Sequence, residues 1–342
     1  GDAGAELEVL AGVREEQIAQ MHAFLAEHEV TVRPSERPWV FDIQVRAEAA
    51  GHAALCEIAG GHTNVIRLER DGEVLLARSY EEAAGASDAP TDRSCLTVEK
   101  IVEFAGEVDL NDVRAVLERQ VECNVTIAEA GLAGSWGANV GSVLLSAYGD
   151  AVANRAKAWA AAGSDARMGG CELPVVINSG SGNQGITASV PVAIYARAFG
   201  IGRERLLRAV ALADLVTIHQ KAGIGCLSAF CGATCAGCGA GAGIAYLLGG
   251  DYQAVAHTIV NALAVVSGMV CDGAKPSCAA KIAAAIDAGI LGYELYCRGQ
   301  EFLDGDGIVR KGVDNTIGNV GRMARSGMRE TDRVILDIMC GC

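Results

Sequence analysis

The stretch Ala222–Gly250 constrains the fold most, because it contains no charged side chain over a length sufficient to cross a lipid bilayer. It also contains the Gly237/Gly241 spacing of small residues that membrane helices use where they touch. However, its nine glycines weaken a helix, and no pattern of positively charged loops supports insertion. We therefore predict that the stretch forms a central, buried helix pair.

Cysteines concentrate in the same region, since six of the thirteen in the chain lie between Ala222 and Lys281. Thiolate sulfur is a soft donor that suits zinc and iron–sulfur clusters, so this concentration indicates a metal site. Free cysteine is also among the most buried side chains and behaves as a small hydrophobe. Some of the six are therefore expected only to pack in the core.

Two sets of cysteines compete as ligands. The local set is Cys231, Cys235 and Cys238, with the spacing by which radical enzymes dependent on S-adenosylmethionine hold a cluster. Steps of four and seven residues also place three thiols on one helix face, where small side chains let another helix approach. Gly237 stands where the radical enzymes usually have an aromatic residue, and no strand–helix alternation surrounds the motif. The local set is thus a motif without its structural context.

The dispersed set is Cys231, Cys271 and Cys278, and these cysteines lie within longer sequence motifs. LSAFC and SGMVCDGAKPSCAAK, together with SDARMGG and NSGSGNQGITASVPV upstream, resemble the iron–sulfur L-cysteine desulfidases, relatives of the bacterial L-serine dehydratase alpha chain. The resemblance runs from near Glu6 to Met339. It implies that the three cysteines hold a [4Fe-4S] cluster with one open iron, and that the chain is a carbon–sulfur lyase.

The reaction implied by the resemblance is β-elimination from L-cysteine to pyruvate, ammonia and hydrogen sulfide, without pyridoxal phosphate. A serine dehydratase of the same family is the first alternative, because it differs only in whether the open iron receives a thiol or a hydroxyl. A non-catalytic protein that binds a cluster or zinc, or whose cysteines only pack, is the alternative from another class.

Charge and composition restrict the partners. The net charge of -14 makes binding to nucleic acid or to an anionic membrane surface improbable. Thirteen cysteines without a signal peptide indicate a reducing, cytoplasmic setting with free thiols. The expected partner is a small amino acid, with a homo-oligomer as a further expectation.

Periodicity predicts an α+β fold. An amphipathic helix at Glu15–Glu27 is expected to pack its apolar face in a core, and alternation from Trp39 to Tyr80 predicts an antiparallel β meander with an Asp71-Gly72 turn. The small, acidic segment Glu82–Asp92 indicates a surface connection. We therefore expect a subdomain at 1–82, followed by a Gly/Ala-rich, all-helical catalytic domain at 83–342.

Two further words predict the substrate site. In NSGSGNQG, glycines permit close approach of a ligand, and the N-terminus of a following helix would bind an anion such as a carboxylate. A polar interdomain loop would explain the same residues. Arg167 in SDARMGG has the planar fork that suits a carboxylate, although a local salt bridge with Asp165 is the alternative. The substrate-binding residues predicted here are Arg167, Ser179, Ser181, Asn183 and Gln184.

The turn GGHTN within the meander contains His62 and Asn64. Hydrogen bonding within a turn would explain both side chains, but the word also matches the family. We therefore expect Asn64 near the substrate and His62 as a candidate catalytic base. His219, Lys221 and His257 lie beside apolar helices, where a satisfied histidine or a lysine reaching out to solvent is the usual explanation, so we leave them out of the site.

The two ends of the chain add two expectations. The chain begins at Gly1 without the N-terminal segment that, by the resemblance, carries the family's catalytic cysteine, so we expect poor turnover by the chain alone and association with another chain or with that segment. Related serine dehydratases place a C-terminal cysteine on the cluster, which makes Cys342 a candidate fourth ligand. An idle, disordered tail is the alternative for Cys342.

Overall fold

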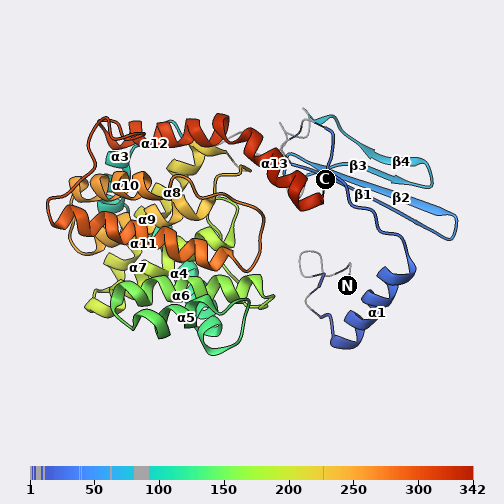
Figure 1. Ribbon diagram of the computed structural model, residues 1–342, viewed down its shortest axis with the longest axis horizontal. Helices are drawn as coiled ribbons and strands as arrows, with labels where there is room; N and C mark the ends of the chain where they lie inside the picture. Colours follow the sequence, from blue (N-terminus) through green and yellow to red (C-terminus); the bar gives the residue numbers. More distant parts are fainter. Residues whose placement is uncertain are drawn as a thin grey trace. The chain divides into compact units, whose positions relative to one another are not determined.

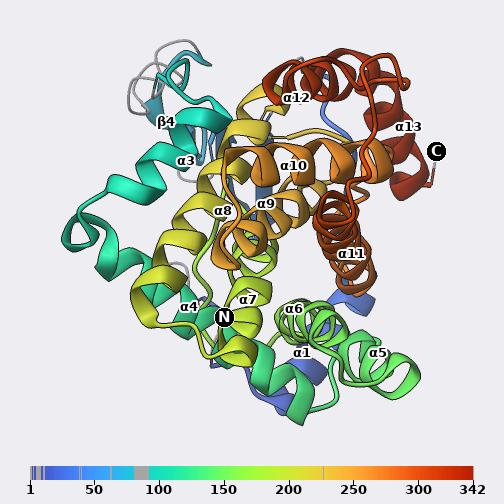
Figure 2. The same cartoon turned by 90° about the vertical axis from the view of Figure 1, so that its left-hand side faces the viewer.

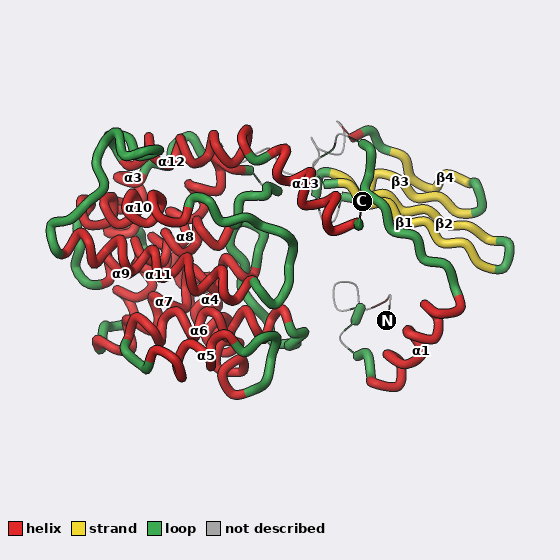
Figure 3. Tube along the Cα trace, in the orientation of Figure 1, coloured by secondary structure: helices red, strands yellow, loops and turns green. Residues whose placement is uncertain are grey.

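The computed structural model of the chain describes residues 2, 4, 9–10, 12–37, 39, 41–61, 64–80, 92–225 and 227–341. The chain divides into two compact units, which we call the N-terminal unit (Gly1–Thr91 with Leu336–Cys342) and the helical unit (Asp92–Ile335). The described strands all lie in the N-terminal unit (Figure 3). This arrangement confirms the predicted α+β class, whereas the connection predicted at Glu82–Asp92 lies outside the described residues except for Asp92.

The sheet of the N-terminal unit is an antiparallel meander in the order β1-β2-β3-β4 (Figure 1). Its strands are β1 Asp42–Ala49, β2 His52–Ala59, β3 Val65–Arg70 and β4 Glu73–Ala77. Asp71 and Gly72 both have positive φ and connect the paired residues Arg70 and Glu73. Such a turn matches the twist of the strands, so the predicted Asp-Gly hairpin is confirmed.

The core of this unit is small. Ala59 and Ile66 are buried, and the stacked rings of Trp39 and Tyr80, with centroids 4.7 Å apart, pack against them. Helix α1 (Glu15–Glu27) has the predicted bounds, but none of its residues is buried. The expectation that its apolar face packs in a core is therefore wrong for the described chain.

The helical unit consists of long helices joined by short loops, as its small residues predicted. Its helices are α3 Val98–Glu107, α4 Leu110–Ala133, α5 Val140–Tyr148, α6 Val152–Met168, α7 Gly182–Phe199, α8 Arg203–Ile224, α9 Gly232–Leu247, α10 Tyr252–Val266, α11 Cys278–Cys297, α12 Val313–Arg322 and the π-helical turn η2 Met323–Gly327. The last helix, α13 (Arg329–Cys340), has residues in both units.

Helix α9 is the centre of the helical unit, because it packs against α7, α8, α10 and α11 (Figure 2). Two of its glycines allow this. A Cβ on Gly237 would lie 2.4 Å from the carbonyl carbon of Ala285 in α11, and one on Gly239 would lie 2.5 Å from the carbonyl oxygen of Ala213 in α8. Only glycine fits where helix backbones approach this closely.

The uncharged stretch does not form the predicted helix pair. It contributes the end of α8, which stops at Ile224, then a connection, and then α9 from Gly232. In the part of the chain that the structure describes, no helix is both long enough and apolar enough to cross a membrane. The glycine spacing therefore serves helix packing inside the unit.

Candidate active site

The start of α9 and the loop between α10 and α11 bring Cys231 and Cys271 together. Phe230 and Val270 form an antiparallel bridge. The amide of Cys231 donates to the carbonyl of Met269 at 3.0 Å, and the amide of Cys271 donates to the carbonyl of Ala229 at 2.6 Å. Two cysteines that are far apart in the sequence are thereby held side by side by backbone hydrogen bonds.

The two thiols interact directly. A hydrogen bond between them lowers the pKa of Cys271 to about 6, against the effect of burial, and raises the pKa of Cys231. The nearby ammonium groups of Lys281 and Lys221 contribute to the lower pKa of Cys271. The pair is therefore predisposed to carry a thiolate, which is the form that binds metal.

Cys278 is the first residue of α11, and its Sγ lies 3.7 Å from the carbonyl oxygen of Gly273. Lys281, one turn further along α11, connects this helix start to the loop of Cys271. Lys281 donates to the carbonyl of Val270 at 3.0 Å and pairs with Asp272. This lysine thus ties the loop of Cys271 to the helix that begins at Cys278.

The arrangement does not resemble a site for one ion. Among the residues that the structure describes, no three His, Cys, Asp or Glu side chains converge closely enough to hold a single metal ion. In an iron–sulfur cluster, however, each thiolate binds a different iron, so its thiols stand apart.

The other two cysteines of the local set lie elsewhere. Cys235 and Cys238 are fully buried in a hydrophobic core with Leu212 and Ile259. Burial raises the pKa of Cys235 to about 12, which disfavours a thiolate there. Cys231, in contrast, packs with a separate core that includes Cys271 at its edge. The geometry therefore favours a packing role for Cys235 and Cys238.

Arg167, near the end of α6, lies against the first turn of α7. Its Nη1 donates to Oδ1 of Asn183 at 3.3 Å, and a Cβ on Gly182 would lie 2.4 Å from its Nε. Asp165 does not pair with it, because the Asp165 carboxylate accepts from the amide of Gly141 at 3.1 Å instead. The alternative of a local salt bridge is thus not observed, and the guanidinium stays beside the helix N-terminus.

The loop before α7 is a tight turn. Asn178 and Ser181 exchange two backbone hydrogen bonds of 3.1 Å, and Ser179 and Gly180 between them have positive φ. The hydroxyl of Ser179 donates to Oδ1 of Asn178 at 2.8 Å, so it is engaged within the loop. Ser181 precedes α7 without capping it through its side chain. Of the two predicted serines, Ser181 is therefore the freer to meet a ligand.

Gln184 connects this loop to the cysteines. It is only 6% exposed, and its Oε1 has no hydrogen-bond partner. A Cβ on Gly232, the residue after Cys231, would lie 2.6 Å from the amide carbon of Gln184. The side chain therefore reaches from α7 to the start of α9 with an unused acceptor, which is unusual for a buried polar group.

The structure thus brings together seven of the residues predicted from the sequence. They are Arg167, Ser181, Asn183, Gln184, Cys231, Cys271 and Cys278. Ser179 lies in the same loop but is already hydrogen-bonded. His62 and Cys342 lie outside the described residues. The Asn64 amide donates to the carbonyl of Ala59 at 2.7 Å within its own turn, and its predicted proximity to the substrate stays a prediction.

Of the residues left out of the predicted site, two histidines have partners: His219 Nε2 lies 2.7 Å from Asp314, and His257 pairs with Glu301.

Asp214 is a site residue that the sequence did not predict, although an acid inside an apolar helix was a usable signal. Its Oδ1 accepts from Gln120 at 2.9 Å and from Asn178 at 2.8 Å, so it anchors the loop before α7. Burial raises the pKa of Asp214 to about 6 despite these bonds.

This raised pKa predicts a pH-dependent stability. Because the folded protein holds the Asp214 proton more tightly than the unfolded chain, the free energy of unfolding falls as pH rises from about 4 to 6, by about 3 kcal/mol. Asp214→Asn keeps an acceptor for Gln120 and Asn178, so it should abolish this fall and stabilise the protein at neutral pH. Thermal unfolding across that pH range measures it, with exposed Asp150→Asn as the control. The same fall in Asp214→Asn would contradict the assignment.

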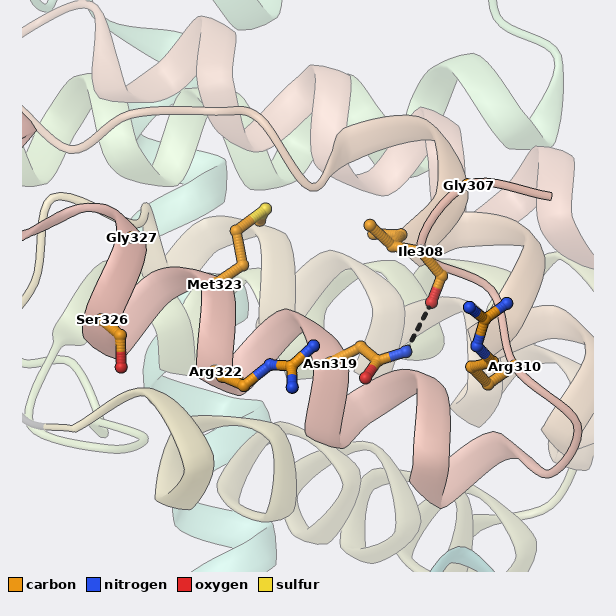
Figure 4. Close-up of a pocket in the computed structure, with 8 residues that line it drawn as sticks. All are labelled: Gly307, Ile308, Arg310, Asn319, Arg322, Met323, Ser326 and Gly327. Atoms are coloured by element: carbon orange, nitrogen blue, oxygen red, sulfur yellow. Dashed lines mark hydrogen bonds between the residues drawn. The ribbon is translucent and has the colours of Figure 1, made fainter. Parts of the chain in front are cut away.

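A cavity of about 510 Å³ lies elsewhere, beside α12 (Figure 4). Arg310 and Arg322 flank Asn319 there, and the Asn319 amide donates to the carbonyl of Ile308 at 2.9 Å. None of the cysteines and no residue of the loop before α7 lines this cavity. It is therefore separate from the candidate site.

Comparison with known proteins places the chain in a family. Residues 4–337 match the family described as the serine dehydratase alpha chain. The chain therefore belongs to the serine dehydratase alpha-chain family, whose members are serine dehydratase-like lyases that generally depend on iron–sulfur clusters. No solved structure gives a significant match.

Individual relatives extend this result. The chain is 54% identical to a UPF0597 protein of Desulfitobacterium hafniense over 97% of its own length and 77% of the relative. It is 48% identical to a UPF0597 protein of Lachnoclostridium phytofermentans, over 99% of its own length and 81% of the relative. It is 43% identical to a UPF0597 protein of Treponema denticola, over 99% of its own length and 80% of the relative. These names state no substrate.

Proposed function

We propose that this chain holds a [4Fe-4S] cluster on Cys231, Cys271 and Cys278 and eliminates hydrogen sulfide from L-cysteine. The observation that carries the proposal is the backbone pairing that holds Cys231 beside Cys271, with Cys278 at the start of α11, where Lys281 bonds to the same loop. The family supports a lyase of this kind. The choice of cysteine as substrate rests on the sequence motifs that resemble those of the L-cysteine desulfidases.

The residues present fit such a cluster. Cys231, Cys271 and Cys278 would bind three of its four irons, and Lys281 would offset part of their negative charge. When bound, the cluster would supply a Lewis-acidic iron that is open to a sulfur or oxygen atom of the substrate.

The chain itself would bind the two ends of the amino acid. The planar guanidinium of Arg167 suits the carboxylate, and the first amides of α7 add donors at the positive end of the helix dipole. The unpaired Oε1 of Gln184 is an acceptor that suits the ammonium group. With both ends held, the α-carbon and its side chain face the cysteines.

The elimination then needs no external oxidant or reductant. A base takes the α-proton, and the carbon–sulfur bond breaks with its electron pair on sulfur, which leaves as hydrosulfide. The other product, 2-aminoacrylate, is hydrolysed to pyruvate and ammonia. His62 stays the candidate for the base from the sequence.

L-serine is the second candidate substrate, and the description of the family favours it. It would lose hydroxide in place of hydrosulfide at the same site. Anaerobic reconstitution tests the proposal: we expect one [4Fe-4S] cluster per chain by iron and sulfide content, and slow release of sulfide with pyruvate from L-cysteine by this chain alone. A zinc-loaded protein, or pyruvate from L-serine alone, would contradict it.

Asn183 tests the carboxylate site. Asn183→Ala removes the side chain that fixes the Arg167 guanidinium, so we expect L-cysteine to bind about tenfold more weakly, as for the loss of one charge-assisted hydrogen bond. Iron and sulfide content should not change. Titration of the visible spectrum with L-cysteine measures the affinity, and Asn315→Ala on the exposed side of α12 is the control. Unchanged affinity for L-cysteine would mean that the loop before α7 does not bind the carboxylate and has only a structural role.

A further inference from the structure

The cavity beside α12 has the features of a second binding site (Figure 4). Its volume of about 510 Å³ lies in the range of cavities that hold small molecules. One wall is a loop, and the other is a single face of α12 and η2, because residues three, four and seven positions apart share a helix face. The residues that matter here are Ile308 and Arg310 on the loop, and Asn319, Arg322, Met323 and Ser326 on the helix.

The two walls of this cavity are fixed to each other. The hydroxyl of Thr316 accepts from the amide of Arg310 and donates to its carbonyl, both at 3.0 Å. The Asn319 amide donates to the carbonyl of Ile308 at 2.9 Å. Val309, between the two loop residues, is buried in the same core as the inner face of α12. The backbone on both sides is therefore in place before any ligand arrives.

The two arginines of the cavity have no acidic partner. Within the described residues, the guanidinium of Arg322 makes no hydrogen bond or ion pair. That of Arg310 reaches only the neighbouring carbonyl of Val309, at 3.4 Å. Arg325, on the next turn, is in contrast bound to the carbonyl of Ala222 at 2.9 Å. In a chain of net charge -14, two unpaired cations at one cavity are a notable exception.

The acids closest in sequence are already engaged. Asp304 accepts from the amide of Lys311 at 3.0 Å, and Asp306 accepts from the amide of Leu303 at 2.7 Å. Asp314, in the first turn of α12, pairs with a histidine of α8. The positive charge of the cavity is therefore left for a ligand. The π-helical turn that carries part of the wall is itself a feature common at functional sites.

We propose that this cavity binds a small phosphomonoester. The site goes beyond the proposed function and shares no residue with it. A phosphate group carries about two negative charges near neutral pH and three terminal oxygens. It can therefore accept paired hydrogen bonds from two guanidinium groups, whereas a single carboxylate occupies only one such fork.

The rest of the lining favours an ester over free phosphate. Ile308 and Met323 are half-buried and supply an apolar part of the wall, against which a short carbon chain can pack (Figure 4). Ser326 adds a hydroxyl one turn beyond Arg322. The cavity is also larger than a phosphate ion needs. Arg310 and Arg322 would thus hold the phosphate, and the apolar side chains would contact the carbon atoms.

Isothermal titration calorimetry at constant ionic strength tests the proposal on the full chain, with equal iron content in all variants. The probes are glycerol 3-phosphate, inorganic phosphate and succinate. We expect glycerol 3-phosphate to bind at one site per chain and more tightly than the other two. No binding of glycerol 3-phosphate, or tighter binding of phosphate or succinate, would overturn the proposal.

Variants then locate the site. Arg310→Gln and Arg322→Gln should each weaken the binding of glycerol 3-phosphate about 10- to 100-fold, as for lost hydrogen bonds to a charged group. Arg322→Lys keeps the charge but loses the fork, so its affinity should lie in between. Arg119→Gln, exposed on α4, is the control.

The exchanged arginines are all exposed, so the midpoint of thermal unfolding without ligand should match that of the wild type. A lower midpoint in a glutamine variant would reveal a folding defect, and the comparison would then rest on Arg322→Lys. Unchanged affinity in the cavity variants, or an equal loss in Arg119→Gln, would show that glycerol 3-phosphate does not bind between the two arginines.

Discussion

Replacing Cys271 with serine is expected to abolish the visible absorption of a reconstituted cluster and to leave less than one cluster's iron per chain. The backbone bonds that hold Cys271 beside Cys231 do not involve its sulfur, so the fold should persist while a ligand is lost. Iron and inorganic sulfide content with the absorption spectrum measure the loss. Cys278→Ser should behave in the same way, because a cluster is held by thiolates.

The matched control is Cys235→Ala. Its thiol lies fully buried in a hydrophobic core, so its removal leaves a small cavity, with a loss of about 1 kcal/mol of stability, and should keep the cluster. Loss of the cluster from Cys235→Ala, together with its retention in Cys271→Ser, would refute the dispersed ligand set. It would revive the local set and the radical-enzyme alternative.

The second large effect is expected from a single methyl group at Gly237. A Cβ there would lie 2.4 Å from the backbone of Ala285, which cannot move without shifting α11. Alanine favours a helix over glycine by about 1 kcal/mol, but the clash should outweigh this gain and lower the stability by about 3 kcal/mol. The midpoint of thermal unfolding measures the change.

Gly318→Ala adds the same methyl group to α12, where nothing lies within 4 Å of the added atom. Here only the helix preference operates, so stability should rise by up to about 1 kcal/mol. Opposite signs at the two glycines would show that α9 and α11 touch through their backbones. A neutral Gly237→Ala would mean that the two helices are further apart.

Part of the site could be predicted because its residues lie in continuous words. The loop before α7 combines glycines, amides and hydroxyls, and its place just ahead of a helix was visible from local pattern. Arg167 was a candidate for its chemistry alone. Whether Arg167 pairs with Asp165 depends on where the Asp165 side chain points. That direction is set by the packing of α5 on α6.

The sequence by itself determined the antiparallel meander, the helical character of the rest and the family, because alternation, turn residues and long words are local properties of the chain. It did not determine that the apolar face of α1 would be exposed, because burial depends on what packs against it. Only the tertiary structure separated Cys231 from Cys235 and Cys238, since neighbouring positions on one chain segment face different cores. It also decided that Lys221, in the last turn of α8, is buried, because burial depends on residues far apart in sequence, which no local pattern contains.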